Sequence, residues 1–272
     1  MQQETIKMLN QLNRDFYYRV ADDFSESRQY YWPGWQKIPL FFKKNQQNAK
    51  KIQVLDVGCG NARFAKFLKK NNFNFNYIGI DNSAKLLKIA QDTLQKEAIS
   101  AELIEFDLID HYLANQQITW PVAEKFDLIV VFGLTHHLPS AQLRLQFFQS
   151  LAKLLKKDAL LVVSNWQFAV DKRFQKNIIS RQKNQPTSKI NTSPIIKLQK
   201  ILNKLEKNDY LLDWRQTTQK SNGDTSIRYC HYLDEKNSKI LFKKADLKIV
   251  DQFFADGKSQ RLNQYFVLKK AN

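Results

Sequence analysis

The sequence has few of the features that mark a secreted or membrane-bound protein. Only two of its 272 residues are cysteines, Cys59 and Cys230, which excludes a disulfide framework and indicates a reducing setting. No run of about 18 apolar residues occurs, so no segment is a candidate for a transmembrane helix. The first residues, MQQETIKMLNQLNRDF, are polar and amphipathic and lack the apolar region of a signal peptide. These absences predict a cytoplasmic protein that does not bind a membrane.

Acidic residues are also scarce. The chain has 26 Asp and Glu against 43 Lys and Arg, which gives a formal net charge of +17. A field of this sign attracts polyanions, nucleic acid before an anionic membrane. The alternative is compositional drift, because the chain is rich in Lys, Asn and Gln and has only 7 glycines. The charge therefore favours RNA binding without establishing it.

Apolar, β-branched segments alternate with segments of helical spacing through the middle of the chain. The expected strands are 52–58, 75–81, 101–107, 126–133 and 159–166. Two of the helices between them have evident caps, Ser83 and Ser140. This alternation predicts an α/β fold, a Rossmann-like doubly wound sheet with right-handed crossovers.

Two segments fall outside this alternation. Residues 1–45 predict one or two helices and then an aromatic loop broken at Pro33-Gly34. Residues 171–209 are rich in Lys, Arg, Asn and Gln and predict a mobile basic insertion, with a short helix capped by Ser193. We expect this insertion to hold RNA by its phosphates.

The periodic pattern then resumes and closes the fold. Residues 238–245 have helical spacing, and 247–255 and 261–270 form a closing strand pair. The chain contains no internal repeat. We therefore expect one domain over residues 1–272, with an N-terminal segment and an insertion before the closing strand pair.

A glycine loop joins the first expected strand to the first expected helix. In VLDVGCGNARF, Gly58 and Gly60 allow a tight turn and a close approach to a ligand. Asp81 ends the second strand about 20 residues further on, where a carboxylate can accept both hydroxyls of a ribose. A dinucleotide-binding loop would carry a third glycine where this chain has Ala62. Asp56, just before the loop, suits a ligand with a cationic amine better than a pyrophosphate.

This loop resembles motif I of the class I S-adenosylmethionine-dependent methyltransferases. The resemblance implies S-adenosyl-L-methionine as cofactor, a binding loop that contains Asp56, Gly58 and Gly60, and Asp81 as the ribose-binding acid. Asp107, at the end of the third strand, matches the position that contacts adenine. The alternative for Asp81 and Asp107 is that each only caps a helix.

Two acceptor chemistries lack their motifs. Enzymes that methylate exocyclic base amines usually carry Asn-Pro-Pro-aromatic after the fourth strand, where this chain has VFGLTHHLPS. Methylation of pyrimidine C5 needs a cysteine nucleophile, but Cys59 lies in the cofactor loop and Cys230 lacks a Pro-Cys or Thr-Cys context. What remains is a nucleophilic acceptor, a carboxylate or an activated hydroxyl. A carboxylate needs orientation, a cation to hold it and exclusion of water.

Two histidines, His136 and His137, follow the fourth strand. Adjacent side chains at a strand end diverge, so we expect one to enter the site and the other to be packed or solvated. Our prediction is that His137 faces the substrate. Adjacent histidines do not readily chelate one ion and no third ligand is near in sequence, so no metal site is predicted.

Four stretches together resemble the eukaryotic tRNA methyltransferases that esterify 5-carboxymethyluridine at the wobble position. They are FSESRQYYWPGW, LDVGCGNARF, LTHHLPS and DWRQTTQKSNGDTSIRYCHYL. The group includes the methyltransferase domain found fused to an oxygenase. The likeness covers nearly the whole chain outside the insertion, with two departures: Ala62 replaces a frequent glycine, and Cys230 stands where the family usually has tyrosine.

The resemblance assigns residues to the acceptor side. Arg28 would lie over the acceptor pocket, where a guanidinium can hold a carboxylate bidentately. Trp32 would wall the pocket or stack on anticodon bases. Arg228, Tyr229 and His231 would add a second cationic and aromatic group beside the same cleft, and His136 would lie there too. The alternatives are a surface ion pair for Arg28 and ordinary strand-edge positions for residues 228–231.

The resemblance thus implies methyl transfer to the carboxylate of a modified wobble uridine in tRNA, forming a methyl ester. The tRNA anticodon loop would be the partner, and some relatives work with a small zinc-binding activator subunit. Two alternatives stay open. One is a small-molecule carboxyl or hydroxyl O-methyltransferase, and the other is a non-catalytic RNA-binding protein on a methyltransferase fold.

Overall fold

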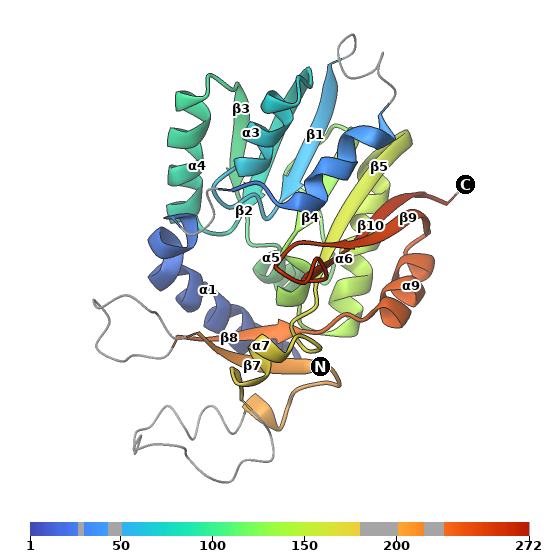
Figure 1. Cartoon of the computed structure of the whole chain (residues 1–272). Helices are drawn as coiled ribbons and strands as arrows, with labels where there is room; N and C mark the ends of the chain where they lie inside the picture. The colour runs from blue at the N-terminus through green and yellow to red at the C-terminus, as the bar shows by residue number, and fades with distance from the viewer. Residues whose placement is uncertain (27–29, 43–50, 180–200, 215–225, 272) are drawn as a thin grey trace.

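A seven-stranded sheet forms the centre of the structure, a computed structural model that describes residues 1–26, 30–42, 51–179, 201–214 and 226–271 (Figure 1). Its strands are β1 (Ile52–Val57), β2 (Phe75–Asp81), β3 (Ala101–Glu105), β4 (Phe126–Phe132), β5 (Leu155–Trp166), β9 (Leu247–Ala255) and β10 (Asn263–Lys270). They lie in the order β3-β2-β1-β4-β5-β10-β9. Strands β1 to β5 run parallel, and β10 runs antiparallel to both β5 and β9. The predicted doubly wound α/β sheet and its closing strand pair are confirmed.

Helices cover both faces of this sheet. One face carries α3 (Arg63–Lys70) and α4 (Ala84–Lys96), and the other carries α5 (Leu108–Asn115), α6 (Ala141–Leu154) and α9 (Glu235–Lys244). The strands are buried on both sides, as parallel strands require: on β1, Val54 packs toward the first face and Leu55 toward the second. Ser83 and Ser140 accept hydrogen bonds from the first turns of α4 and α6, which confirms both predicted caps. Among the described residues, no helix has the length and apolar character needed to cross a bilayer.

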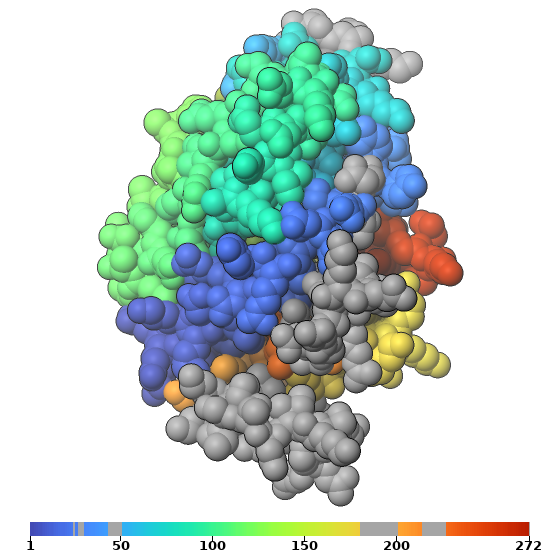
Figure 2. Space-filling view, turned by 90° about the vertical axis from the view of Figure 1, so that its left-hand side faces the viewer, coloured from blue at the N-terminus to red at the C-terminus, as the bar shows by residue number. Residues whose placement is uncertain are grey.

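The N-terminal segment is a long helix followed by a short one. Helix α1 (Gln3–Glu26) lies across α4, α5 and a second, smaller sheet. It is the blue surface across the middle of the molecule in Figure 2. After it, the predicted aromatic loop is a 3-10 helix, η1 (Pro33–Phe41), which begins at the Pro-Gly pair. Trp35 and Ile38 of η1 are buried against the face that carries α3. The N-terminal segment thus closes over the sheet.

The second sheet has three antiparallel strands, β6 (Ile178–Ile179), β7 (Asp209–Trp214) and β8 (Ser226–His231). Residues 180–200 of the predicted basic insertion, with the capping Ser193, lie outside the described residues. Before them lie α7 (Lys172–Gln175) and β6, and after them Ile201, Leu202 and Leu205 pack with Leu9 of α1. The described ends of 171–209 thus form regular elements and part of a small core, and the mobility of the insertion stays a prediction.

Candidate active site

The strand order reverses between β1 and β4, and the predicted cofactor loop lies at this point. Chain segments leave adjacent strands in opposite directions here, which opens a crevice at the carboxyl ends of the strands. Gly58 has φ +78 and Gly60 has φ +54, the left-handed region that favours glycine. A Cβ on Gly58 would lie 3.2 Å from the Cβ of Leu134, so the loop also passes close to the segment after β4. Ala62 has φ 55 as well, which explains why glycine is frequent at this position in similar loops.

Asp81 is bound to the glycine loop across the crevice. Its carboxylate accepts a hydrogen bond from the Gly60 N–H at 2.9 Å and another from the Ser83 N–H at 2.9 Å. Desolvation raises the pKa of Asp81, although these N–H groups act in the opposite direction. The carboxylate is therefore held in place beside the loop.

Asp107 has both of the roles that the sequence left open. It caps α5 by accepting the N–H groups of Ile109 and Asp110 at 3.0 Å. It also accepts the side-chain amides of Asn10 and Asn82, each at 3.2 Å, and lines the same cavity as Asp81. Contact with an adenine stays a prediction.

Asp56 lies beneath the loop and is 3 % exposed. The Tyr77 hydroxyl donates to its carboxylate at 2.7 Å. Burial raises the pKa of Asp56 to about 7, since the charged form is poorly solvated there. A nearby cationic group would restore the ionised form.

Two cavities meet at the glycine loop. The smaller, which we call the loop cavity, has a volume of about 110 Å³ and is lined by Gly58, Gly60, Asp81, Asp107 and apolar side chains. The larger, which we call the aromatic cavity, has a volume of about 480 Å³. Both are lined by the same strip of residues: Tyr17, Gly58, Gly60, Phe132 and Gly133. A group bound in one cavity can therefore reach a group bound in the other.

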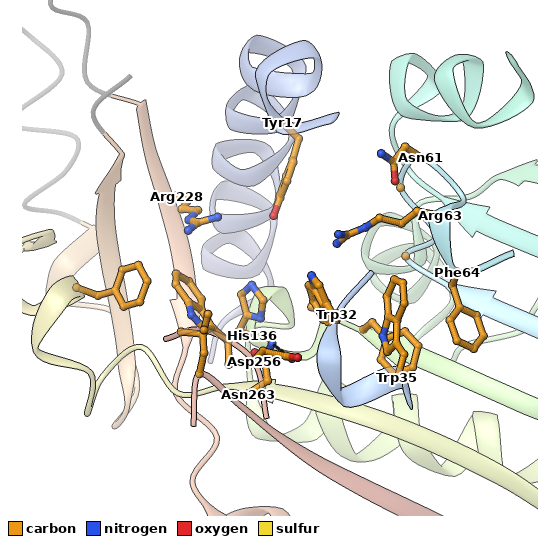
Figure 3. Close-up of a pocket in the computed structure, with 18 of the residues that line it drawn as sticks. Tyr17, Trp32, Trp35, Asn61, Arg63, Phe64, His136, Arg228, Asp256 and Asn263 are labelled. Atoms are coloured by element: carbon orange, nitrogen blue, oxygen red, sulfur yellow. Dashed lines mark hydrogen bonds between the residues drawn. The ribbon is translucent and has the colours of Figure 1, made fainter. Parts of the chain in front are cut away.

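Seven aromatic side chains besides His136, and three arginines, line the aromatic cavity (Figure 3). The aromatic residues are Tyr17, Trp32, Trp35, Phe64, Phe132, Trp166 and Phe174, and the arginines are Arg63, Arg173 and Arg228. The Arg63 guanidinium lies 5.0 Å from the Trp32 ring centroid, and that of Arg228 lies 4.9 Å from the centroid of Trp166. Figure 3 shows Arg63 and Arg228 pointing toward one another from opposite sides of the cavity. The cavity can thus hold a planar group between aromatic walls and an anion near a guanidinium.

Trp32 and Arg228 lie where the sequence placed them, beside this cavity. Trp32 packs over Gly133, where an added Cβ would lie 3.3 Å from the indole. The Phe16 ring of α1 supports Arg228 from a second side, at 5.0 Å. Arg28 lies outside the described residues, so its placement over the acceptor pocket stays a prediction.

Both histidines are buried, and each lines a different cavity: His136 the aromatic cavity and His137 the loop cavity, against α1. The residue beside the aromatic cavity is therefore His136, not the predicted His137. The His137 ring bonds the Tyr17 hydroxyl through Nε2 at 2.7 Å and the Tyr229 carbonyl through Nδ1 at 3.1 Å. The Asn13 side-chain amide nitrogen also lies 3.2 Å from Nδ1, so three groups hold the ring in place. Burial lowers the pKa of His137 to about 3, with Arg228 acting in the same direction, so the ring is neutral at physiological pH.

Tyr229 and His231 do not line the aromatic cavity, and their predicted place at its wall is corrected. Tyr229 is fully buried and its hydroxyl donates to Asp209 at 2.7 Å. His231 is 6 % exposed and contacts the same carboxylate at 2.7 Å. Along β8, alternate side chains point to opposite sides, and this sends Tyr229 and His231 into the small core while Arg228 faces the cavity. Their contribution is to hold β8 in place.

The structure supplies a third potential metal ligand that lies far away in sequence. Ligand atoms of His136, His137 and Cys230 lie within 4.8 Å of one another. Burial raises the pKa of the Cys230 thiol to about 12, so it keeps its proton at neutral pH, and both His137 nitrogens are engaged. A buried thiol and a hydrogen-bonded ring are typical of a packed cluster, and the absence of a metal stays a prediction.

Sequence reasoning missed two residues of the site. Tyr17 lies on α1, more than a hundred residues from its partner His137, and only the fold brings them together. Arg63 directly follows the glycine loop as the first residue of α3. A cation at the mouth of that loop was the signal that could have identified it.

The loop cavity suits the adenosine end of S-adenosyl-L-methionine, and its volume of about 110 Å³ leaves the methionine end to the adjoining aromatic cavity. The positive φ angles of Gly58 and Gly60 bring backbone close to a ligand, and Asp81 offers acceptors for a ribose diol beside it. Phe106, Leu108 and Leu134 supply an apolar lining suited to adenine. Asp56 lines the adjoining aromatic cavity beside Gly58, where its carboxyl group suits a cationic amine.

Comparison with known proteins agrees with this fit. Residues 24–252 match a family model described as a methyltransferase domain. The S-adenosylmethionine-dependent methyltransferase from Clostridium acetobutylicum superposes over 94% of this chain with a TM-score of 0.59 and 13% identity. The CcbJ methyltransferase from Streptomyces caelestis covers 93% with a TM-score of 0.61 and 12% identity. At such identities the likeness shows the shared fold.

Two kinds of curated relative share sequence with the chain. The tRNA (carboxymethyluridine(34)-5-O)-methyltransferase alkbh8 of Xenopus tropicalis is 26% identical over 182 residues, which are 65% of this chain and 25% of the relative. The ubiquinone biosynthesis O-methyltransferase of Actinobacillus pleuropneumoniae is 31% identical over 129 residues, 46% of this chain and 52% of the relative. The chain thus spans about a quarter of the first and half of the second. From the matched family model, the fold and the loop together, the chain belongs to the methyltransferase-domain family and is a class I, S-adenosylmethionine-dependent methyltransferase.

Proposed function

We propose that this enzyme transfers a methyl group to the carboxylate of a modified wobble uridine in tRNA and forms a methyl ester. The observation that carries this proposal is the aromatic cavity beside the glycine loop, with Arg63 and Arg228 facing each other across it (Figure 3). Its volume of about 480 Å³ lies in the range of roughly 300–1,000 Å³ for small-ligand sites. A pyrimidine with a carboxymethyl arm has the planar ring and the anion that such a cavity suits.

The chain's own residues would orient the acceptor and exclude water. Arg228 lies between Phe16 and Trp166, so its guanidinium plane is fixed and its edge can hold a carboxylate bidentately. A carboxylate has an ordinary pKa of about 4 and is ionised at neutral pH, so its oxygen needs no general base. S-adenosylmethionine, when bound, supplies an electrophilic methyl group. His136, Trp32 and Trp35 would shield the reacting oxygen from solvent.

Two observations support tRNA as the substrate: the net charge of the chain and its sequence similarity to a tRNA methyltransferase. The net charge of +17 favours RNA over a neutral metabolite. The relative that acts on carboxymethyluridine aligns with 65% of this chain, and the ubiquinone enzyme with 46%. We also propose, on the family resemblance, a cytoplasmic location and a small zinc-binding activator subunit. Assay of the chain alone and with such a subunit would test the latter.

The deciding experiment is mild alkaline treatment of tRNA that was methylated with a labelled donor. A methyl ester releases its label as methanol, whereas a methyl group on nitrogen, carbon or ribose oxygen stays on the RNA. Parallel reactions with small aromatic acids and with quinols test for a small-molecule acceptor. Label retained on tRNA after alkali, or transfer to the small molecules alone, would overturn the proposal.

A further inference from the structure

A third cavity lies beside the aromatic cavity and has a different character. It has a volume of about 810 Å³ and lies between α7, the start of α9 and the loop that joins β9 to β10. We call it the basic cavity. Its charged lining residues are Lys172, Arg173, Lys236, Lys258 and Arg261 with Asp171, Asp234 and Glu235.

The three acids of the basic cavity already have partners. Asp171 pairs with the Arg173 guanidinium and caps α7. Asp234 caps α9 and accepts the side chain of Asn237. Glu235 pairs with Lys239 and accepts two glutamine amides. Asp171 and Glu235 are thus neutralised by cations of the protein, whereas Asp234 is hydrogen-bonded but makes no ion pair among the described residues.

Four cations of the same cavity remain available. Lys172, Lys236, Lys258 and Arg261 are all exposed, and none of them makes an ion pair with any residue in the described part of the chain. The cavity wall also offers aromatic surface. The Arg261 guanidinium lies 4.1 Å from the Phe254 ring centroid, and Tyr232 lies on the same wall. A flat guanidinium backed by a ring is a surface on which a nucleobase stacks.

The basic and aromatic cavities adjoin each other at Arg173 and Gly257. Arg173 lines both, and a Cβ on Gly257 would lie 3.4 Å from its guanidinium. Gly257 belongs to the aromatic cavity and the next residue, Lys258, belongs to the basic cavity. Gly257 has φ +66 and an added Cβ would lie 2.9 Å from Leu262, so this loop is closely packed at the junction. An RNA chain that leaves the aromatic cavity past Gly257 would therefore enter the basic cavity.

We propose that the basic cavity binds the RNA nucleotide next to the methyl acceptor, with its phosphate on Lys258 and Arg261 and its base against Arg261 and Phe254. This proposal rests on tRNA as substrate. The four cations that make no ion pair outnumber the one such acid of the cavity, Asp234, and this excess of positive charge suits the phosphates of an RNA chain. The basic cavity would then select an acceptor within RNA over the same base as a free nucleoside.

The test is equilibrium binding of a fluorescent anticodon stem-loop RNA, without cofactor, to wild type and to Lys258→Ala/Arg261→Ala. We expect the double variant to bind roughly tenfold more weakly at low salt, and the slope of log affinity against log salt to fall by about 0.7, the value for one lost single-strand phosphate contact. The matched control is Lys243→Ala/Lys244→Ala, which removes two exposed lysines from the far end of α9 that line none of the three cavities. Equal affinity and slope in the double variant and wild type, or an equal loss in the control, would overturn the proposal.

A second measurement separates this proposal from the proposed function. Methylation of free 5-carboxymethyluridine should be the same in Lys258→Ala/Arg261→Ala and wild type, while KM for the stem-loop RNA rises about tenfold. If RNA binding depends on Lys258 and Arg261 but no alkali-labile ester forms, the ester assignment fails and the binding site stands. If the ester forms but RNA binding does not depend on Lys258 and Arg261, the binding site fails and the ester assignment stands.

Discussion

The loop cavity and the aromatic cavity share a border but are built in different ways. The acids and glycines of the loop cavity come from successive strand ends, with Asn10 and Asn13 added from α1, and hydrogen bonds between neighbouring units, such as Gly60 to Asp81, hold them in place. The aromatic cavity draws on α1, η1, α7, β8 and the loop after β9, which the chain visits far apart in sequence. One half of the site therefore follows from the order of a Rossmann-like sheet, and the other depends on long-range packing.

The strongest test of this contrast is to remove Arg228 from the acceptor half. Losing one partner of a charge pair costs about 2–5 kcal/mol, so kcat/KM of Arg228→Ala should fall at least about 30-fold while affinity for S-adenosylmethionine is unchanged. Arg228→Lys should recover little, because the planar fork is lost. Steady-state kinetics and calorimetry check both. As a control, Arg19→Ala removes an exposed arginine of α1 that lines none of the cavities. A loss of cofactor affinity in Arg228→Ala would break the separation of the two halves.

In the cofactor half, Asp81→Asn should have the opposite pattern. Charge-assisted hydrogen bonds contribute about 1.5–3 kcal/mol, so calorimetry should show roughly tenfold or more weaker binding of S-adenosylmethionine. Affinity for the acceptor RNA should stay the same. Asp92→Asn, an exposed change on α4, is the control. Unchanged cofactor affinity in Asp81→Asn would remove this carboxylate from the site.

How far the sequence predicts each half follows from this contrast. The glycine loop, Asp81 and Asp107 lie at ends of strands whose apolar pattern is evident, so their meeting could be predicted from topology alone. The orientation of His136 and His137 could not, because it depends on Tyr17 and on the Tyr229 carbonyl, which approach from α1 and β8. The burial of Tyr229 and His231 likewise depends on Asp209, a partner that no local pattern reveals.

A third prediction uses pH to sharpen the role of Asp56 at the border of the two halves. Its pKa of about 7, against an ordinary 3.8, means that the free protein holds a proton that a cationic ligand would expel. Affinity for S-adenosylmethionine should therefore rise up to about tenfold from pH 6 to pH 8, with proton release. Because the raised pKa disfavours the charged form, stability of the free protein should fall as pH rises from about 4 to 7.

Calorimetry in buffers of different ionisation enthalpy, together with thermal melts, measures both effects of Asp56. Asp56→Asn should flatten both pH profiles between pH 4 and pH 8, since the amide does not titrate. A wild-type affinity that is independent of pH would show that Asp56 does not face the ligand's amine.

The smallest expected effect concerns Ala62, which departs from the usual loop. Its φ of 55 strains a non-glycine residue, but its methyl group is fully buried. Relief of strain and loss of burial oppose each other in Ala62→Gly, so the free energy of unfolding should change by less than about 1 kcal/mol. Ala65→Gly, in the interior of α3, has no strain to relieve and should lose more than that. Denaturant titration measures both variants. A larger loss of unfolding free energy in Ala62→Gly than in Ala65→Gly would contradict the proposed backbone strain at Ala62.

The strip shared by the loop and aromatic cavities also matters for inhibition. Because Gly58, Gly60, Phe132, Gly133 and Tyr17 border both, one molecule can occupy both cavities through a short linker that crosses this strip. Its second half would then bind at a high effective concentration, which multiplies affinity without new contacts. Selectivity over other class I enzymes would reside in the half that lies between Arg63 and Arg228, since the glycine loop is the part that such enzymes have in common.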